Sequence, residues 1–181
     1  MRFNLIAFRS DAPGSRVPSP LDAVDHIMGV MVAAFPPEFG EAWNRRQVSD
    51  ALLLTSTHYG LITPDGRIDA WANAPVAGFY LSRSVLDEEE LLLFAIAPEW
   101  RRRGLGHRLL GEFIANAQAR GIIRLFLEMR RDNPAGILYA AHDFHPVGIR
   151  PGYYRTANGE RIDAITQEYL ITAASENVTS A

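Results

Sequence analysis

One stretch of about forty residues constrains the fold of this 181-residue chain more than any other. Residues 91–97 form a nearly continuous apolar run, which is typical of a strand buried on both faces. A helix with one apolar face is expected from Gly104, and Gly121 is a natural cap at its C-terminus. Residues 125–129 then alternate across the two faces of a second strand. Strand, helix and strand in so short a stretch make the two strands parallel, so we predict an α/β fold with a mixed sheet.

The rest of the chain supplies the other elements of this sheet. Apolar periodicity and turn residues predict helices over about 21–34, 43–54 and 134–142, and strands over about 59–63, 76–85, 147–155 and 162–171. The last two strands flank a turn at 157–159 and are expected to form a hairpin. We predict three parts: an N-terminal strand and proline-rich linker over 1–20, a single domain over 21–173 and a tail over 174–181.

Composition excludes several functions. The chain has no cysteine, which excludes disulfides, thiolate zinc sites and a cysteine nucleophile, and its five histidines show no paired spacing for a metal. The net charge of -3 argues against nucleic acid as a partner. No apolar run reaches the roughly 20 residues that a membrane span needs, and no signal peptide is evident, so we expect a cytoplasmic protein with no membrane contact. We expect it to be a monomer or a homodimer.

The segment 101–107, Arg-Arg-Arg-Gly-Leu-Gly-His, joins the buried strand to the helix. Two glycines allow close approach of the backbone to a ligand, and the unpaired amides of a first helical turn attract anions. The segment therefore has the features of a pyrophosphate cradle, although it matches neither a Walker loop nor the dinucleotide fingerprint. On these residues alone, an ordinary glycine turn with solvated arginines remains an equal alternative.

The order of motifs favours the cradle. Arg-x-x-Gly-x-Gly follows a strand that ends in Ala97-Pro98, and Leu-Glu-Met-Arg and Asn133 precede a helix that carries Leu138-Tyr139. This order, over residues 76–171, resembles the GCN5-related N-acetyltransferase (GNAT) superfamily, and in particular its bacterial ribosomal-protein-alanine N-acetyltransferase branch. The resemblance implies a mixed sheet whose fourth and fifth strands splay apart, with acetyl-coenzyme A as co-substrate in the gap.

The resemblance also implies which residues hold the co-substrate. The main chain of Phe94, Ala95 and Ile96 would contact the pantetheine and acetyl arm, and Asn133 would hold the arm on its other side. The pyrophosphate would lie on the loop formed by Arg102, Arg103, Gly104, Leu105, Gly106 and His107.

Two side chains are candidates for proton transfer. A lone strand glutamate such as Glu128 is usually an exposed carboxylate, but within Leu-Glu-Met-Arg the resemblance makes it the base that deprotonates the amine. Tyr139 among apolar neighbours is usually a core residue, but the resemblance places it at the sulfur of coenzyme A as the acid. Asp143 stands where the family commonly has glycine, so the turn after this helix is expected to differ.

The acceptor is the least constrained part of the prediction. Tyr153 and Tyr154 resemble a hairpin that holds the acceptor peptide in N-terminal acetyltransferases, and two stacked aromatic residues are an equal alternative. The loop 35–43, longer than is usual in the branch, would form the opposite wall. We predict direct acetyl transfer to a primary amine, preferably the α-amine of a protein or peptide N-terminus. Two alternatives are a small-molecule amine as acceptor and a non-catalytic acetyl-coenzyme A-binding module.

Overall fold

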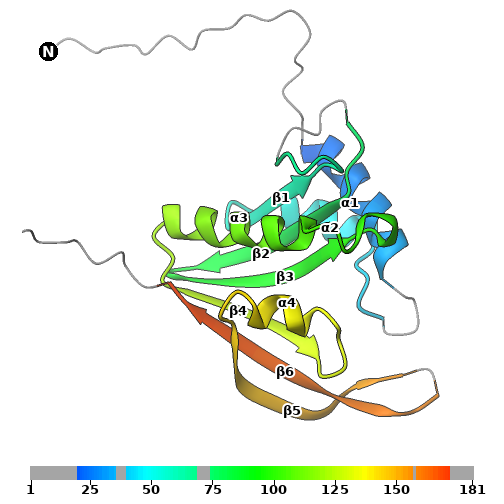
Figure 1. Ribbon diagram of the computed structural model, residues 1–181, viewed down its shortest axis with the longest axis vertical. Coiled ribbons are helices and arrows are strands. Elements are labelled where there is room, and N and C mark those ends of the chain that lie inside the picture. The colour runs from blue at the N-terminus through cyan, green and yellow to red at the C-terminus, as the bar shows by residue number, and fades with distance from the viewer. Residues whose placement is uncertain (1–19, 36–39, 69–73, 157, 172–181) are drawn as a thin grey trace, which may run out of the picture.

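The computed structural model describes residues 20–35, 40–68, 74–156 and 158–171 (Figure 1). The helices are α1 Pro20–Ala34, α2 Arg45–Leu52, the 3-10 turn η2 Pro98–Trp100, α3 Leu105–Ala119 and α4 Gly136–Ala140. The strands are β1 Thr57–Ile62, β2 Gly78–Val85, β3 Glu88–Ile96, β4 Arg124–Arg130, β5 His145–Arg155 and β6 Arg161–Leu170. No helix among the described residues is both long and apolar enough to cross a bilayer.

The six strands form one mixed sheet in the order β1-β2-β3-β4-β6-β5. The β3–β4 pair is parallel, as the crossover predicted, and the other neighbours are antiparallel. β5 and β6 form a long twisted hairpin beside β4 (Figure 1). The predicted mixed α/β sheet with flanking helices is therefore confirmed.

Helices cover both faces of the sheet, and each face has its own core. Leu109, Leu110 and Phe113 of α3 pack in a cluster that also holds Leu125 and Leu127 of β4. On the opposite face, α1 and α2 pack in a second cluster whose members include Val24, Ile27, Val48, Phe79 and Leu81. Because the middle strands are covered on both faces, they need apolar side chains in both directions, which explains their nearly continuous apolar sequences.

A β-bulge changes the direction of β3 in its middle. Leu81 of β2 lies opposite Leu93, but the next residue, Ser82, lies opposite Leu91, so Leu92 is an extra residue on β3. Leu91 packs in the α3 cluster, whereas Leu92 and Leu93 both pack on the α1 side. Bulges bend the strand that carries them and increase its twist. The bend begins one residue after the last β3–β4 pair, Leu91 with Leu127, so it accounts for the parting of the two strands.

The predicted helices and strands are confirmed with small shifts in their ends, apart from two features. The helix predicted over 134–142 is shorter, Gly136–Ala140, and its N-cap is Ala135 rather than Asn133. The amide oxygen of Asn133 instead accepts a hydrogen bond from the backbone N–H of Ala135 (2.9 Å), which forms a turn ahead of the helix. The predicted strand at 3–8 and the linker up to residue 19 lie outside the described residues, as does the tail 174–181, so the limits of the domain stay a prediction.

Candidate active site

The sheet opens between β3 and β4. The two strands pair only from Glu88 to Leu91 and from Arg124 to Leu127. Beyond that point β3 pairs only with β2, and β4 pairs only with β6. In the stretch Phe94–Ile96, the backbone groups of β3 that face the gap have no partner strand and can bind an extended ligand, although the carbonyl oxygen of Ile96 already accepts from Arg101.

The glycine loop lies at the start of α3. Gly104 is the N-cap with φ of 78°, and Arg102 also has a positive φ, 61°. A Cβ on Gly104 would meet no atom within 4 Å, so the backbone conformation is what favours glycine there. None of the described side chains caps the N-terminus of α3, so the first-turn N–H groups remain available to an anion.

The second glycine of the loop serves close packing. A Cβ on Gly106 would lie 3.3 Å from Cδ2 of Leu138 and 3.9 Å from Cγ1 of Ile96. The absence of a side chain at Gly106 thus allows α3 to approach both α4 and the end of β3. This packing brings the uncapped helix end to the mouth of the gap.

The arginines of the loop have different surroundings. Arg101 is tied to the protein, because its guanidinium donates to the carbonyl oxygens of Ile96 (2.9 Å) and Ala34 (3.3 Å). Arg103 lies over the ring of Trp100, 4.8 Å from its centre. Arg102 is exposed and makes no hydrogen bond or ion pair with the described residues, so its charge is available to a phosphate.

His107 lies one turn into α3 and stacks on a second histidine. Its Nδ1 is 3.2 Å from Nε2 of His142, and the ring centres are 5.3 Å apart. Burial, with His107 as a second cause, lowers the pKa of His142, and Asp143 acts in the opposite direction. Among the described residues, no three histidine or carboxylate side chains come together to hold a metal ion.

Tyr139 of α4 is buried beside the gap. Its ring packs edge-on against Phe94 of β3, with centres 6.2 Å apart, and against Phe144 at 5.9 Å. Burial is the main cause that raises the pKa of Tyr139, and the negative charge of Glu41 adds to it. No described residue forms a hydrogen bond with its hydroxyl. The phenol therefore keeps its proton at neutral pH and remains free to donate it to a ligand.

The turn after α4 has a left-handed residue at Asp143. Asp143 has φ of 63°, the left-handed conformation that glycine adopts most easily. The backbone N–H groups of His142 and Phe144 both donate to the carbonyl oxygen of Tyr139, at 3.0 and 3.1 Å. Asp143 therefore adopts a conformation typical of glycine, so this turn can form without glycine at the position. Aspartate tolerates this conformation better than most residues, which explains its use here.

Glu128 lies on β4 just beyond the last β3–β4 pair, opposite Thr166 of β6. Its side chain is one-fifth exposed, and Oε2 lies 3.0 Å from Nη2 of Arg150 on β5. That oxygen is buried and forms no hydrogen bond of good geometry within the described chain. A partly buried carboxylate with an unsatisfied oxygen is suited to accept a proton or a donor from a ligand.

The two hairpin tyrosines differ in their surroundings. Tyr153 is 56% exposed, and the guanidinium of Arg150 lies 5.1 Å from its ring centre. Glu128 pairs with Thr166 of β6, and Tyr154 pairs with Ile162 of the same strand. Ile162 and Thr166 are separated by an even number of residues, so Tyr154 and Glu128 lie on the same face of the sheet. Burial first, then the charges of Glu41 and Glu128, raises the pKa of Tyr154 to about 12. The structure thus brings Tyr154 into the environment of Glu128 and leaves Tyr153 largely in solvent.

Sequence reasoning missed two charged residues in this region. Glu41, in the loop before α2, lies 3.2 Å from Nε of the buried Arg130, which also lies 3.6 Å from Asp132. Burial raises the pKa of Glu41, although Arg130 opposes the shift. Arg130 was detectable in principle, because strand alternation puts it on the same face as Glu128. Glu41 had no signal beyond its place in the loop that was predicted to wall the acceptor site.

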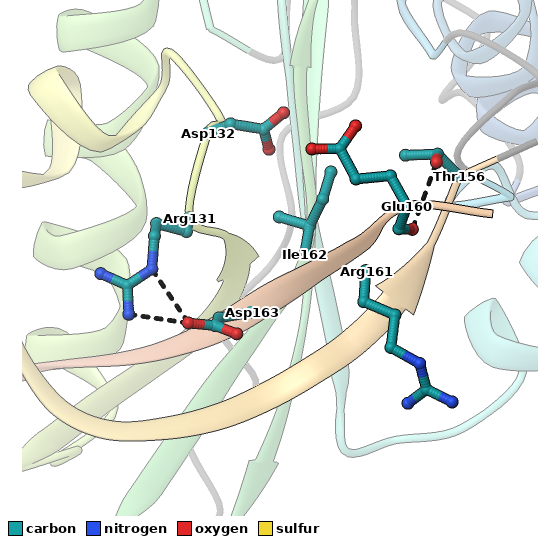
Figure 2. Close-up of a pocket in the computed structure, with 7 residues that line it drawn as sticks. All are labelled: Arg131, Asp132, Thr156, Glu160, Arg161, Ile162 and Asp163. Atoms are coloured by element: carbon teal, nitrogen blue, oxygen red, sulfur yellow. Dashed lines mark hydrogen bonds and ion pairs between the residues drawn. The ribbon is translucent and has the colours of Figure 1, made fainter. Parts of the chain in front are cut away.

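A cavity of about 430 Å³ lies at the end of the β5–β6 hairpin (Figure 2). It is lined by Arg131, Asp132, Thr156, Glu160, Arg161, Ile162 and Asp163. The cavity does not include Glu128 or Tyr139, so it is separate from the β3–β4 gap.

Comparison with known proteins identifies the family. Residues 66–146 match the sequence profile of the acetyltransferase (GNAT) domain. A putative [ribosomal protein bS18]-alanine N-acetyltransferase from Bacillus subtilis is 31% identical over 142 residues, which are 77% of this chain and 85% of that protein. The chain belongs to the GNAT acetyltransferase family. The resemblance expected from its motifs is confirmed.

Other GNAT proteins support the assignment over different lengths. The [ribosomal protein bS18]-alanine N-acetyltransferase of Salmonella typhimurium is 42% identical over 95 residues, 52% of this chain and 64% of that protein. The chain thus spans less than two thirds of the length of that curated relative. The crystal structure of the Escherichia coli ribosomal-protein-S18-alanine N-acetyltransferase matches with a TM-score of 0.70 and 29% identity, over 90% of this chain and 96% of that one.

A more distant structure bears on the fold alone. An aminoglycoside 6'-N-acetyltransferase complexed with coenzyme A matches with a TM-score of 0.65 and 14% identity, over 83% of this chain and 92% of that one. The GNAT fold is therefore one in which coenzyme A has been seen bound.

Proposed function

We propose that this GNAT protein is an N-acetyltransferase that uses acetyl-coenzyme A to acetylate the α-amine of a protein N-terminus, with the N-terminal alanine of ribosomal protein bS18 as its leading acceptor. The observation that carries the proposal is the gap between β3 and β4. There an unpaired strand edge, an uncapped helix N-terminus, a buried phenol and a partly buried carboxylate occur together. The names of the Bacillus and Salmonella relatives suggest the acceptor.

The residues of the gap fit acetyl-coenzyme A. The first-turn N–H groups of α3, with Gly104 in a left-handed conformation before them, suit a diphosphate, and the exposed Arg102 adds a free positive charge. We assign Arg102, Arg103, Gly104, Leu105, Gly106 and His107 to the pyrophosphate, Phe94, Ala95 and Ile96 to the arm, and Asn133 to its other side. When bound, acetyl-coenzyme A supplies a thioester whose acyl carbon is open to attack by an amine.

Side chains of the protein then carry out the proton transfers. An α-ammonium has a pKa of about 8, so near neutral pH it must lose a proton before it can attack. Glu128 accepts that proton, directly or through water, at its partly buried carboxylate, whose Oε2 lies 3.0 Å from Arg150. Tyr139 holds its proton because burial raises its pKa, and it donates that proton to the sulfur that departs; the second proton that the attacking nitrogen loses then restores the phenol.

The acceptor lies between two walls in this proposal. The loop that carries Glu41 forms one, and the hairpin with Tyr153 and Tyr154 forms the other. A narrow slot favours a small first side chain, whereas a lysine side chain would have to thread about four methylenes into it. A cytoplasmic location agrees with a ribosomal acceptor and belongs to the same proposal.

A peptide acetylation assay with mass-spectrometric site assignment tests this function. One peptide that begins with alanine and contains an internal lysine is offered in two forms, with a free N-terminus and with a blocked one. We expect release of free thiol, and a single acetyl group on the α-amine, only with the free form. Peptides that begin with Ser or Gly should also react, and those with a bulky first residue should react poorly.

Three results would contradict the proposal. Equal acetylation of the free and blocked forms would indicate a lysine acetyltransferase, and activity only on free polyamines would indicate a small-amine enzyme. Binding of acetyl-coenzyme A in a calorimeter, with no thiol release for any amine, would indicate a non-catalytic module.

A further inference from the structure

The hairpin strand β5 carries a large irregularity. Arg150 pairs with Ala164 and Tyr154 pairs with Ile162, so three residues of β5, Pro151 to Tyr153, lie opposite one residue of β6, Asp163. Gly152, in the middle of this bulge, has φ of 58°. A Cβ there would come within 3.1 Å of the Arg161 side chain. A bulge this long removes hydrogen bonds from the ladder, so its shape needs another support.

The side chain of Asp163 supplies that support. Its Oδ1 accepts a hydrogen bond from the backbone N–H of Gly152 at 2.8 Å. Its Oδ2 accepts two more from Arg131, from Nε at 3.1 Å and from Nη2 at 2.9 Å, as Figure 2 shows. The hydrogen bond from the Gly152 backbone is the main cause that lowers the pKa of Asp163, and the hydrogen bond from Arg131 is the second cause. The carboxylate therefore stays charged at neutral pH.

Arg131 links this support to the strand of the proposed base. It directly follows β4, which carries Glu128, and its own backbone N–H donates to the carbonyl oxygen of Asp163 at 2.9 Å. One side chain therefore joins the bulge of β5 to the end of β4. The distance between the β5 bulge and the end of β4 therefore determines how far the β5–β6 hairpin lies from the β3–β4 gap.

The residues on either side of the bulge face the acceptor side of the gap. Arg150, immediately before it, lies 3.0 Å from Glu128 and over the ring of Tyr153. Tyr153 and Tyr154 pack edge to face, with ring centres 5.2 Å apart. A change in the shape of the bulge would rotate all three side chains relative to Glu128.

We propose that Asp163 is a positioning residue for the acceptor: by holding the Gly152 bulge and Arg131 together, it fixes Arg150 and Tyr154 near Glu128, and it fixes Tyr153 against Arg150. The inference rests on the proposed acetylation of an N-terminal amine, because it assigns the hairpin to the acceptor. Asp163 touches no reacting atom in this proposal.

Two substitutions separate the contacts of Asp163. Asp163→Ala removes the acceptor of the Gly152 N–H and the partner of Arg131. Asp163→Asn keeps an oxygen for the Gly152 N–H, and it replaces the oxygen that accepts from Arg131 with an NH2 donor, so it removes the Arg131 contact alone. Glu90→Gln is the matched control, because it removes an exposed carboxylate from a strand-to-strand ion pair, with Arg83 at 3.1 Å, away from the hairpin.

The measurements are steady-state kinetics with an alanine peptide, the Kd of acetyl-coenzyme A by calorimetry, and amide hydrogen exchange at Gly152. We expect Asp163→Ala to lower kcat/KM for the peptide by about 10- to 100-fold, the usual cost of a displacement near 1 Å. Most of the loss should be in the peptide KM, with the acetyl-coenzyme A Kd within about twofold of wild type. The Gly152 amide should exchange faster in Asp163→Ala and stay slow in Asp163→Asn, which should recover only the part of the loss that the Gly152 contact accounts for. Glu90→Gln should match wild type.

The failures of the inference and of the proposed function are distinguishable. Wild-type protein that acetylates no free N-terminus refutes the function, and the inference with it. Active wild type together with an Asp163→Ala variant of unchanged peptide kcat/KM overturns the inference alone. Equal losses in the peptide KM and in acetyl-coenzyme A affinity would also overturn it, because they would mean general damage to the fold. If Asp163→Ala does not fold, Asp163→Asn decides: a raised peptide KM with unchanged acetyl-coenzyme A affinity supports the clamp, and peptide kinetics like wild type overturn it, because this variant lacks the Arg131 contact.

Discussion

The two ends of the β3–β4 pair differ in whether their buried polar groups have hydrogen-bond partners. At the closed end, where the strands are paired, Glu89 is fully buried, and its carboxylate accepts from Ser82 at 2.6 Å and is paired with Arg120. At the open end, Oε2 of Glu128 is buried and lies 3.0 Å from Arg150 but forms no hydrogen bond of good geometry, and no described residue forms a hydrogen bond with the hydroxyl of Tyr139. Buried polar groups in proteins are normally satisfied, so those left unsatisfied mark places where a ligand completes the bonding. The closed end stabilises the fold, whereas the open end is where the proposed function places the chemistry.

The closed end also shows why a buried charge is not by itself a functional signal. Arg120, from the end of α3, contacts Glu89, so this carboxylate fastens the helix to the sheet. Burial is the main cause that lowers the pKa of the nearby His58, and the charge of Arg120 is the second cause. The ring of His58 forms a hydrogen bond with Ser84. Each member of the cluster has a partner within the protein, and none faces the gap.

The sharpest test of the comparison applies one substitution at both ends. At the closed end, Glu89→Gln should lower the free energy of unfolding by about 3 kcal/mol, because it leaves Arg120 without its counter-charge. Urea denaturation measures this loss. Activity per folded molecule should stay close to wild type. The neighbouring Glu90→Gln, on the exposed face, should change stability by no more than about 0.5 kcal/mol. A large loss of activity in folded Glu89→Gln would remove the distinction between the two ends.

At the open end, Glu128→Gln should have the reverse effects. The rate near pH 7 should fall by roughly 100-fold, the usual contribution of a general base, while unfolding changes by less than about 1 kcal/mol. The loss should shrink as the pH rises above about 8, because the amine then deprotonates without help. A pH-rate profile with an alanine peptide measures both. A small and pH-independent loss would leave Glu128 a structural residue.

Two buried tyrosines give a smaller version of the same contrast. Tyr139→Phe should lower kcat by at least about tenfold with little change in acetyl-coenzyme A affinity, because the hydroxyl is needed where charge develops on sulfur. Tyr80 is the control, since its hydroxyl already accepts from Asn116 at 3.3 Å. Tyr80→Phe should cost about 1 kcal/mol of stability and leave kcat unchanged. Equal losses in kcat and in cofactor affinity for Tyr139→Phe would indicate a packing role.

The smallest expected effect concerns the turn behind Tyr139. Asp143→Gly should raise stability by about 0.5 kcal/mol, because the strain of the left-handed residue exceeds the extra freedom that glycine gives the unfolded chain. Ala140→Gly, in the helical part of α4, should lower stability by about 1 kcal/mol. Thermal unfolding compares the two. A destabilised Asp143→Gly would show that the aspartate side chain contributes more than the backbone conformation costs.

The sequence predicted those features that depend on neighbouring residues. Apolar alternation, glycine caps and proline turns placed the helices and strands, and a short crossover made β3 and β4 parallel. Glu128 and Tyr139 were identified from local motifs, and both do lie at the gap, although their catalytic roles stay predictions. The contacts that the sequence did not reveal join residues far apart in the chain: Glu41 with Arg130, Glu128 with Arg150, and Gly152 with Asp163. No periodicity within one segment encodes such pairs. The bulge at Leu92 was also missed, because an extra residue in an apolar run leaves the run apolar.

That bulge shows how little sequence is needed to open a sheet. Without it, simple parity would put Leu93 and Ala95 on the face of Leu91, and Phe94 and Ile96 would face α1. With Leu92 inserted, the parity reverses, and Phe94 and Ile96 pack on the side of α3 and Tyr139. The phase of β3 therefore depends on a residue count and not on the chemistry of any one side chain. Substitutions at Leu92 that keep the count should preserve the gap, whereas loss of one residue would turn every following side chain of the strand to the opposite face.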